Sequence, residues 1–248
     1  RSTTLCPIAI GLVESYVHTG GKVAVLLSLG TSTADAANLE NVQLLAKDLC
    51  MHIAATSPVC VSRNDVPEEL VAKEKEIAMA QAEGKPPQAI EKIVQGKLDK
   101  YFSNSCFLEQ SFVKDPDHSI QGLLTSTGKE IGAELTVEKF VRFQVGEEVS
   151  FEFVNLTTFK FKIIALKMNH SIHFECVESA WDNIGHIMKY ELEENEGKTR
   201  VRYTYEGFSE MNDAYANMNF SSGKYLESLR QFCQTGKGEA FGSPDYRS

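Results

Sequence analysis

The 248-residue sequence predicts an α+β protein in two parts, and three observations lead to this prediction. A β-hairpin pattern near the start is followed by helical patterns. Two charged amphipathic helices joined by a Gly/Pro turn stand between residues 66 and 101. After about residue 149 the pattern changes to closely spaced strand-like runs that end in one helix. We therefore expect a first part over 1–148 and a β-rich second part over 149–248.

The first expected elements are a hairpin and a helix. Within residues 11–29, two β-rich runs surround the turn Thr19-Gly20-Gly21-Lys22. A helix is expected from Asp35 to about Ala55, and Ser57-Pro58 ends it. Apolar residues recur in this helix at intervals of three and four, as on one buried face: Leu39, Val42, Leu45, Leu49 and Ile53.

The stretch 66–101 predicts a helical hairpin. Pro67 stands at a helix start, and Glu68 and Glu69 follow in the first turn, where acidic side chains interact favourably with the helix dipole. Gly84-Lys85-Pro86-Pro87 breaks the pattern before a second helix, QAIEKIVQGKLDKYF. Two such helices form an antiparallel pair. The same pattern is also typical of a packed helix pair in any globular fold.

The remaining elements follow in order. A loop over 108–119 precedes a short helix at about 119–132 and a strand at 137–145. Five strand-like runs come next, with a turn at Glu194-Asn195-Glu196-Gly197: SFEF, KFKIIAL, IHFECVESA, HIMKYELEE and TRVRYTYEGF. A closing helix is expected at about 212–234. Its predicted buried stripe consists of Met218, Tyr225, Leu226, Leu229 and Phe232.

Composition excludes several functions. The net charge of −9, without a dense Lys/Arg block, argues against direct nucleic-acid binding. No apolar run approaches the ~18–20 residues of a membrane span. The six cysteines lie far apart in sequence without a Cys-x-x-Cys pair, so we expect buried or semi-buried thiols in a reducing compartment rather than a disulfide framework or a zinc site. The missing initiator Met suggests a processed, truncated or engineered start.

No residue pattern indicates an enzyme or a cofactor. No nucleophile–base pair, metal cluster or phosphate loop stands out. His170 and His173 lie in a strand-like stretch, where residues three apart point to opposite faces, so we expect no metal site there. The predicted protein is therefore a binding or structural protein without a metal or cofactor.

Motifs in the first part resemble the elongation factor Ts core. They keep the family order over about 11–148 with almost no gaps. The matching segments are GLVESYVH at 11–18, GKVAVL at 21–26, LCMHIAA at 49–55, DVPEE at 65–69, KEKEI at 73–77, GKP at 84–86, IEKIVQGKL at 90–98 and FVRFQVGE at 140–147. The resemblance implies binding to the GTPase elongation factor Tu and faster GDP release, with no bond chemistry. It also implies that the 66–101 hairpin is an arm for self-association or for reaching the partner.

One departure from the family affects the expected activity. The family's exchange motif, Thr-Asp-Phe-Val, pushes an aromatic side chain toward the partner's Mg²⁺ and phosphate site. Aligned without gaps, it falls on Thr33-Ala34-Asp35-Ala36, where only Thr33 matches. Asp35, at the aromatic position, has a charge that repels phosphate or seeks magnesium. The alternative is that Asp35 is a helix cap or first-turn acid. In either case we expect weak nucleotide exchange.

Two histidines match positions at which the family touches elongation factor Tu. His18 lies at the hairpin turn and His52 on the first helix. Each is expected to contact the partner, and the alternative is a surface or half-buried histidine without one. The partner-binding set is thus His18, His52, Thr33 and Asp35.

The second part, about 149–241, is similar to the later portion of START-like (SRPBCC) domains of the Hsp-ATPase-activator type. The similar segments are KTRV at 198–201, YEGF at 205–208, YLESL at 225–229 and TGKG at 235–238. The resemblance implies a partial helix-grip fold with a place for an apolar ligand. Trp181 and Phe208 are candidates to line it, although core packing is the favoured role for both. Either the preceding segment or a partner covers the missing side, or the chain is a chimera.

Three functions stay open at this stage. The first is binding to elongation factor Tu with impaired exchange, ranked ahead because most of the core motifs match. The second is a structural subunit of a larger organellar assembly, and the third is apolar-ligand binding by the second part. The resemblance places the protein in the bacterial cytoplasm or in the matrix or stroma of an organelle.

Overall fold

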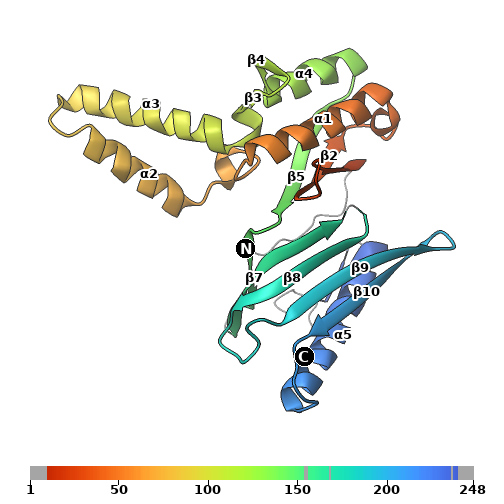
Figure 1. Cartoon of the computed structure of the whole chain (residues 1–248). Coiled ribbons are helices and arrows are strands. Elements are labelled where there is room, and N and C mark those ends of the chain that lie inside the picture. The colour runs from red at the N-terminus through yellow and green to blue at the C-terminus, as the bar shows by residue number, and fades with distance from the viewer. Residues whose placement is uncertain (1–9, 154–155, 168, 236, 240–248) are drawn as a thin grey trace. The chain divides into compact units, whose positions relative to one another are not determined.

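The computed structural model describes residues 10–153, 156–167, 169–235 and 237–239 (Figure 1). The chain packs into two compact units. The amino-terminal unit consists of Ile10–Tyr16 and Val25–Arg142. The carboxy-terminal unit contains the described residues from Phe143 onward together with the hairpin tip Val17–Ala24. The mixture of helices and sheets agrees with the expected α+β class. Within the described residues, no helix is long and apolar enough to cross a membrane.

A three-stranded sheet runs through the hairpin region in the order β1-β2-β5. Its strands are β1 (Gly11–Val17), β2 (Val23–Thr31) and β5 (Leu135–Gln144), so the predicted hairpin and the strand near 137–145 are confirmed. Along β2, Val25, Leu27 and Leu29 are at most 2% exposed, whereas Leu26 is 48% exposed. This alternation shows that one face of the sheet is buried.

Helix α1 (Glu40–Thr56) packs on the buried face through Val42, Leu49 and Ile53, which are 0% exposed. It begins later than predicted. Residues Ala36–Asn38 form a separate 3₁₀ turn, η1, and Leu39 is extended with φ −69° and ψ 132°. Leu39 is accordingly exposed and does not belong to the buried stripe. The helix ends as expected before Pro58, with Ser57 in the left-handed conformation at φ 51°.

The helical hairpin is confirmed. Helices α2 (Glu68–Gln81) and α3 (Pro87–Ser105) form an arm that extends away from α1 and the sheet of the same unit (Figure 1). The short 3₁₀ turn η2 (Arg63–Asp65) leads into it. Few arm side chains are buried, whereas Ile77 and Met79 are exposed. A small cluster of Cys60, Val66 and Cys106 packs at the base of the arm against Tyr101 and Phe102.

The segment expected to be a loop over 108–119 contains regular structure instead. After the 3₁₀ turn η3 (Phe107–Glu109), strands β3 (Ser111–Phe112) and β4 (Asp115–Ser119) form a small antiparallel hairpin. Its turn is held by a side chain from α1, a tertiary contact without a local sequence signal. The short helix is confirmed as α4 (Ile120–Ile131), where the Ser119 hydroxyl accepts the Gly122 N–H at 3.1 Å.

The carboxy-terminal unit contains an antiparallel five-stranded sheet in the order β10-β9-β8-β7-β6. All five predicted strands are confirmed: β6 (Glu148–Phe153), β7 (Thr157–Lys167), β8 (Ser171–Glu178), β9 (Ile187–Asn195) and β10 (Lys198–Glu206). The predicted turn is confirmed between Asn195 and Lys198, which pair. Glu196 and Gly197 both have positive φ, 52° and 71°, which indicates a type I′ hairpin turn.

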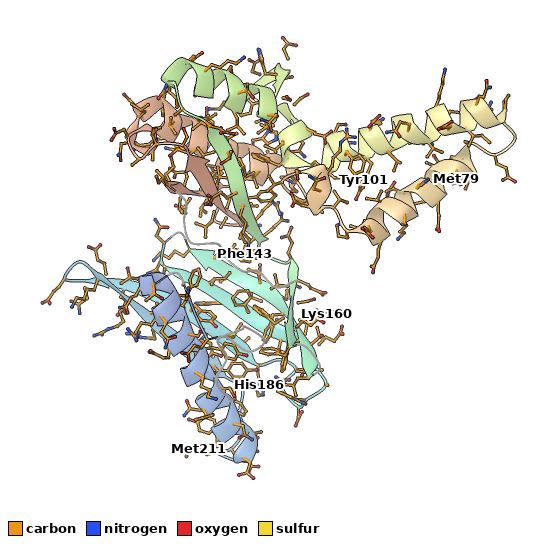
Figure 2. All side chains as sticks on the ribbon, turned by 180° about the vertical axis from the view of Figure 1, so that it is seen from behind. Met79, Tyr101, Phe143, Lys160, His186 and Met211 are labelled. Carbon is orange, nitrogen blue, oxygen red and sulfur yellow. The ribbon has the colours of Figure 1, made fainter. Side chains whose placement is uncertain are left out.

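Helix α5 (Asp213–Thr235) lies on one face of this sheet (Figure 2). The Tyr225 ring packs edge-on against Phe153, with centroids 5.9 Å apart. Of the predicted stripe, Met218, Tyr225, Leu226 and Phe232 are half-buried. Leu229 is 38% exposed, so its predicted burial is wrong. Ser228 is buried in its place, because the chain beyond the helix returns against it at Gly238.

Candidate partner-binding surface

Thr33 and Asp35 lie together in an exposed loop of the amino-terminal unit, between β2 and α1. Hydrogen bonds fix the loop backbone: the Thr31 hydroxyl donates to the Thr33 carbonyl at 2.8 Å, and the Ser32 N–H donates to the Glu134 carbonyl at 3.0 Å. The loop thus presents its side chains to solvent from a constrained backbone, which lowers the entropy lost when a partner binds.

The interpretation of Asp35 as a helix cap is wrong. Asp35 precedes the 3₁₀ turn η1, but its side chain makes no capping hydrogen bond. Its backbone is already helical, with φ −66° and ψ −33°, whereas a capping side chain needs an extended backbone to reach back to the first N–H groups. The carboxylate is therefore directed to solvent rather than committed to the helix.

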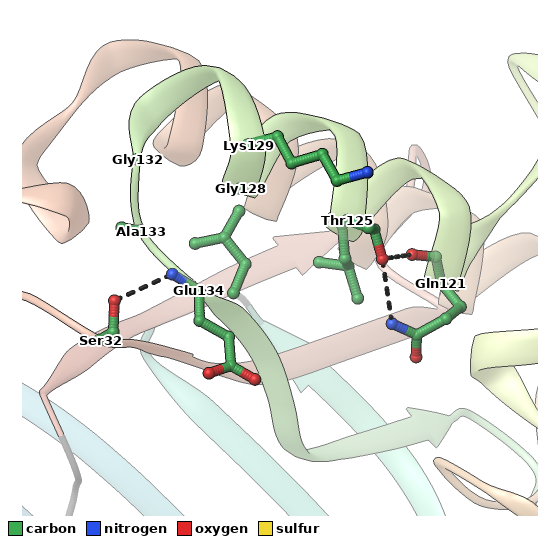
Figure 3. Close-up of a pocket in the computed structure, with 10 residues that line it drawn as sticks. Ser32, Gln121, Thr125, Gly128, Lys129, Gly132, Ala133 and Glu134 are labelled. Atoms are coloured by element: carbon green, nitrogen blue, oxygen red, sulfur yellow. Dashed lines mark hydrogen bonds between the residues drawn. The ribbon is translucent and has the colours of Figure 1, made fainter.

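A shallow pocket of about 450 Å³ lies beside this loop, between α4 and the segment that leads into β5 (Figure 3). Its wall is apolar at Leu124 and Leu135, which are 2% and 5% exposed. Polar side chains complete the lining: Ser32, Gln121, Thr125, Lys129 and Glu134. The Ser32 hydroxyl accepts the Glu134 N–H at 2.9 Å, so the pocket and the loop share one hydrogen-bonded edge.

The sequence analysis predicted only a short helix at about 119–132 and did not predict this pocket. The available signal was the run of small residues Gly128, Gly132 and Ala133. Gly128 lets the helix approach the following segment, and its carbonyl accepts the N–H groups of Gly132 and Ala133. A Cβ atom at Gly128 would meet the Ala133 carbonyl oxygen at 2.7 Å.

Replacing Gly128 by alanine is expected to destabilise the protein by about 1–3 kcal/mol, because the methyl group forces the backbone of the pocket apart. Gly96→Ala is the matched control, since this α3 glycine has no atom within 4 Å of a new Cβ. That change is expected to stabilise the protein by about 0.5–1 kcal/mol through helix propensity. Urea denaturation followed by circular dichroism measures both. Equal effects at the two sites would contradict the role of Gly128.

His18 is exposed at the hairpin tip, within the carboxy-terminal unit. Its backbone is fixed by two turn hydrogen bonds, from the His18 N–H to Val23 and from the Gly21 N–H to the His18 carbonyl, each 2.9 Å. The N–H of Val145 donates to the neighbouring Lys22 carbonyl at 2.7 Å, which anchors the tip to the strand region that follows. The predicted partner contact at His18 stays a prediction.

His52 lies in the core instead of on the surface. Its ring is 0% exposed and packs near Phe107 and Phe112, with centroids 5.7 and 5.9 Å away. The Val113 N–H donates to Nδ1 at 3.2 Å, so Nε2 carries the proton and donates to Gln110 Oε1 at 2.9 Å. With no exposed surface, the side chain is unavailable to a partner in this structure. The expected contact at His52 is corrected to a structural role.

Burial lowers the pKa of His52 below its usual value of 6.5, and the hydrogen bond to Gln110 opposes this shift only in part. Between the lowered pKa and 6.5, the unfolded chain takes up a proton that the folded chain does not. The free energy of unfolding is therefore expected to fall as pH drops through this window, by at most about 1.4 kcal/mol per pH unit. Denaturation at several pH values measures the slope. His52→Gln should flatten it, whereas His118→Gln, at an exposed site, should not.

Trp181 and Phe208 occupy separate aromatic contacts in the carboxy-terminal unit. The Trp181 side chain is 50% exposed and packs edge-on against Phe159 at 5.1 Å. Phe208 is half-buried between His186 and Tyr215, at 4.8 and 5.4 Å. The contacts of Phe208 match the core-packing alternative, whereas Trp181 is too exposed to belong to a core. For both residues a ligand-lining role stays a prediction.

The two histidines of the H-x-x-H pattern are not both on a strand. His173 lies in β8, whereas His170 lies in the turn before it. Among the residues that the structure describes, no three His, Cys, Asp or Glu side chains gather as a metal site would require.

Comparison with known proteins decides the family of the chain. The family described as Elongation factor TS matches residues 2–147, more than half of the sequence. The chain belongs to the elongation factor Ts family.

Elongation factor Ts from Acetivibrio thermocellus is 46% identical over 143 residues, which cover 57% of this chain and 66% of the relative. The proteins from Moorella thermoacetica and Geobacter sulfurreducens are 44% and 46% identical over 141 and 139 residues, covering 56% and 55% of this chain and 70% and 64% of theirs. This elongation factor Ts family member thus spans about two thirds of the length of these relatives. These matches do not show which residues align with the exchange motif, so its position at 33–36 stays a prediction.

A solved structure similar to the chain is the solution structure of the Aha1 dimer from Colwellia psychrerythraea. It is 28% identical and covers 38% of this chain and 70% of its own, with a TM-score of 0.36. That score is too low to support a conclusion about the carboxy-terminal unit.

Proposed function

We propose that the chain binds elongation factor Tu and exchanges its nucleotide only weakly. The family match over residues 2–147 supports this proposal. Elongation factor Ts proteins act in translation by speeding the release of GDP from elongation factor Tu, which is a change in binding equilibrium and not a bond-making reaction. On this basis the chain is not an enzyme. It would work in the bacterial cytoplasm or in an organelle matrix or stroma.

Weak exchange is supported by the chemistry of the exposed loop. Thr33, Ala34 and Asp35 are all exposed, and the three side chains include no aromatic ring. The phosphates of a bound nucleotide depend on Mg²⁺ and on positively charged partners. A bulky apolar side chain displaces such contacts by filling the site, whereas the Asp35 carboxylate is small and repels phosphate. The loop is therefore better suited to binding elongation factor Tu than to displacing its nucleotide.

Docking is proposed at the amino-terminal unit through this loop and the polar edge of the neighbouring pocket. Ser32, Lys129 and Glu134 offer a hydroxyl group and both signs of charge beside the apolar wall of Leu124. Exposed groups of both charge signs at one edge can pair with complementary groups on a partner surface. His18 would make a second contact from the hairpin tip. The 66–101 arm would reach the partner or a second copy of the chain. We place the end of the elongation factor Ts-like part at residue 148.

The test combines a binding and a kinetic measurement on the full chain. Immobilised chain is incubated with elongation factor Tu, and the release of fluorescent GDP is followed by stopped flow. We expect capture of elongation factor Tu with little acceleration of release. Capture with fast release would contradict the weak-exchange proposal. No capture would contradict the binding proposal and favour the structural-subunit alternative.

Restoring the motif tests the assignment of the exchange position. The double variant Ala34→Asp/Asp35→Phe is expected to raise the GDP release rate about fivefold or more, the lower end of typical coupling between two sites. The control Ala216→Asp/Asn217→Phe introduces the same residues at exposed positions of α5, outside the proposed docking surface and the arm, and should leave the rate unchanged. Unchanged release with the first variant, despite intact capture, would show that the motif does not belong at 33–36.

A second candidate function is apolar-ligand binding by a START-like carboxy-terminal unit. Its sheet presents an aromatic surface beside α5, where burial raises the pKa of Tyr190 to about 12 and raises that of Tyr203 as well. Tyr225 of α5 packs on this surface against Phe153. Native mass spectrometry of the purified chain tests the idea, since a bound lipid-like molecule adds a discrete mass. A ligand-free mass after gentle purification would count against it.

A further inference from the structure

Two cysteines that are 46 positions apart in sequence meet at the base of the arm. Cys60 and Cys106 face each other across an isolated parallel β-bridge, with their sulfur atoms 3.8 Å apart. They are 7% and 0% exposed. The sequence analysis expected buried or semi-buried thiols, and the sequence spacing gave no sign of this pair. Two thiols in van der Waals contact can form an intramolecular disulfide, which two distant thiols cannot.

The backbone holds the two cysteines in register. The Val59 N–H donates to the Ser105 carbonyl and the Phe107 N–H donates to the Cys60 carbonyl, each at 2.9 Å. The Leu108 N–H donates to the Val61 carbonyl at 3.1 Å. These three bonds join the chain before α2 to the chain after α3. The base of the arm is thus a short two-segment ladder with the sulfur pair at its centre.

This geometry suits a disulfide. Bridged residues of neighbouring strands stand about 4.8 Å apart, within the ~4.4–6.8 Å that Cα atoms span in disulfides. From their present separation the sulfur atoms must approach by about 1.8 Å to form a bond. Rotation of the two side chains about their Cα–Cβ bonds is the movement that this approach requires. The Cys60 thiol, which now donates to the Ser62 carbonyl at 3.2 Å, would give up that weak contact.

The arm is enclosed between the two cysteines. Helices α2 and α3 both lie within the interval 61–105. Arg63 already holds the same base from outside, since its guanidinium bonds Asp99 of α3 at 2.9 Å and lies over the Phe102 ring at 4.6 Å. These contacts are largely exposed to solvent and therefore add little to the stability of the arm. A covalent bond between Cys60 and Cys106 would close the loop that contains the whole arm.

We propose that Cys60 and Cys106 form a reversible disulfide that fastens the base of the helical arm when a small-molecule disulfide such as oxidised glutathione is present. The Cys60 thiolate attacks the small disulfide, forming a mixed disulfide and releasing one small thiol. The Cys106 thiolate then attacks the Cys60 sulfur and releases the second. Two protein thiols and one disulfide thus become one protein disulfide and two small thiols, and two electrons pass from the protein to the reagent.

The reaction is expected to be slow at neutral pH and faster in base. Burial raises the pKa of Cys106 to about 12, with further contributions from Cys60 and Glu109, and Arg63 opposes the shift. Only the thiolate is reactive, so oxidation waits for brief opening of the ladder. The site therefore responds to sustained oxidising conditions rather than to a short exposure.

The test uses the full-length chain. Reduced protein is equilibrated in glutathione buffers of increasing oxidised fraction, quenched with acid, alkylated and digested for mass spectrometry. We expect one cross-linked peptide pair that joins Cys60 to Cys106. Cys233 is exposed and serves as an internal control, because it should carry a glutathione adduct under the same conditions. Alkylation of both Cys60 and Cys106 while Cys233 carries the adduct would overturn the proposal, as would a cross-link that appears only in urea.

Variants and hydrogen exchange complete the test. Cys106→Ala should stop the reaction at a Cys60–glutathione adduct, whereas Cys50→Ala, at another buried cysteine, should leave the cross-link intact. In the wild-type chain, the amide hydrogens of Phe107 and Leu108 should exchange about tenfold more slowly after oxidation, since closing a long loop restrains opening. A cross-link without slower exchange would overturn the fastening role.

Discussion

Replacing Phe107 by alanine is expected to lower the free energy of unfolding by about 3–5 kcal/mol, the range found for truncating a buried aromatic ring. Phe107 is 0% exposed and lies where several elements of the amino-terminal unit meet. Its ring is 5.7 Å from that of His52 on α1 and 5.6 Å from that of Phe140 on β5. Alanine would leave a cavity between helix and sheet, and the adjacent ladder at Cys106 limits how far the backbone can collapse into it.

The matched control for this prediction is Phe220→Ala on α5. The Phe220 side chain is 67% exposed, and the Lys224 ammonium group lies over its ring at 5.2 Å. Its truncation is expected to change the free energy of unfolding by less than about 0.5 kcal/mol. Urea denaturation followed by far-ultraviolet circular dichroism compares the two. If Phe107→Ala shifted the curve no more than Phe220→Ala, the assignment of Phe107 to the core would be wrong.

Local sequence patterns predicted most of the elements, because these elements depend on local periodicity. The hairpin, the arm, α4, the five strands of the second sheet and α5 all follow from spacing of apolar residues and from Gly/Pro turns. The patterns failed where a distant contact decides the structure. The hairpin of β3 and β4 depends on the bond from Val113 to His52, 61 positions away, and no local pattern contains that information.

The candidate site was predictable only in part for the same reason. The motif match placed Thr33 and Asp35 in one partner-binding set, and both residues are found together in the exposed loop. The pocket beside the loop needs α4, β5 and Ser32 to meet, which only the tertiary fold specifies. The Cys60–Cys106 pair likewise arises from the ladder that closes the arm. For His52 the sequence prediction failed. The motif match suggested a partner contact but contained no information on the burial of the side chain.

The role of His52 gives the second large expected effect. His52→Ala is expected to destabilise the protein by about 3 kcal/mol or more at pH 7.5, where the ring is neutral. The change would leave the Val113 N–H without its present acceptor, and an unsatisfied buried polar group costs about 1–3 kcal/mol. Among the described residues, Gln110 Oε1 would keep only the Thr56 hydroxyl as a donor, at 3.0 Å. The lost ring would add a cavity beside Phe107 and Phe112. Gln110 also donates to the Asn104 carbonyl at 2.6 Å, so the loss would loosen the end of α3.

His118→Ala is the control that separates a structural role from a surface role. The His118 imidazole is exposed and pairs with Asp115 at 2.8 Å, so its removal should cost less than about 1 kcal/mol. Both variants are measured for unfolding free energy and for capture of elongation factor Tu. A core role predicts that His52→Ala weakens capture only in proportion to the fraction unfolded, and that folded molecules still bind. Full stability combined with lost capture would instead mean that the His52 ring reaches the partner, and that the buried arrangement opens on binding.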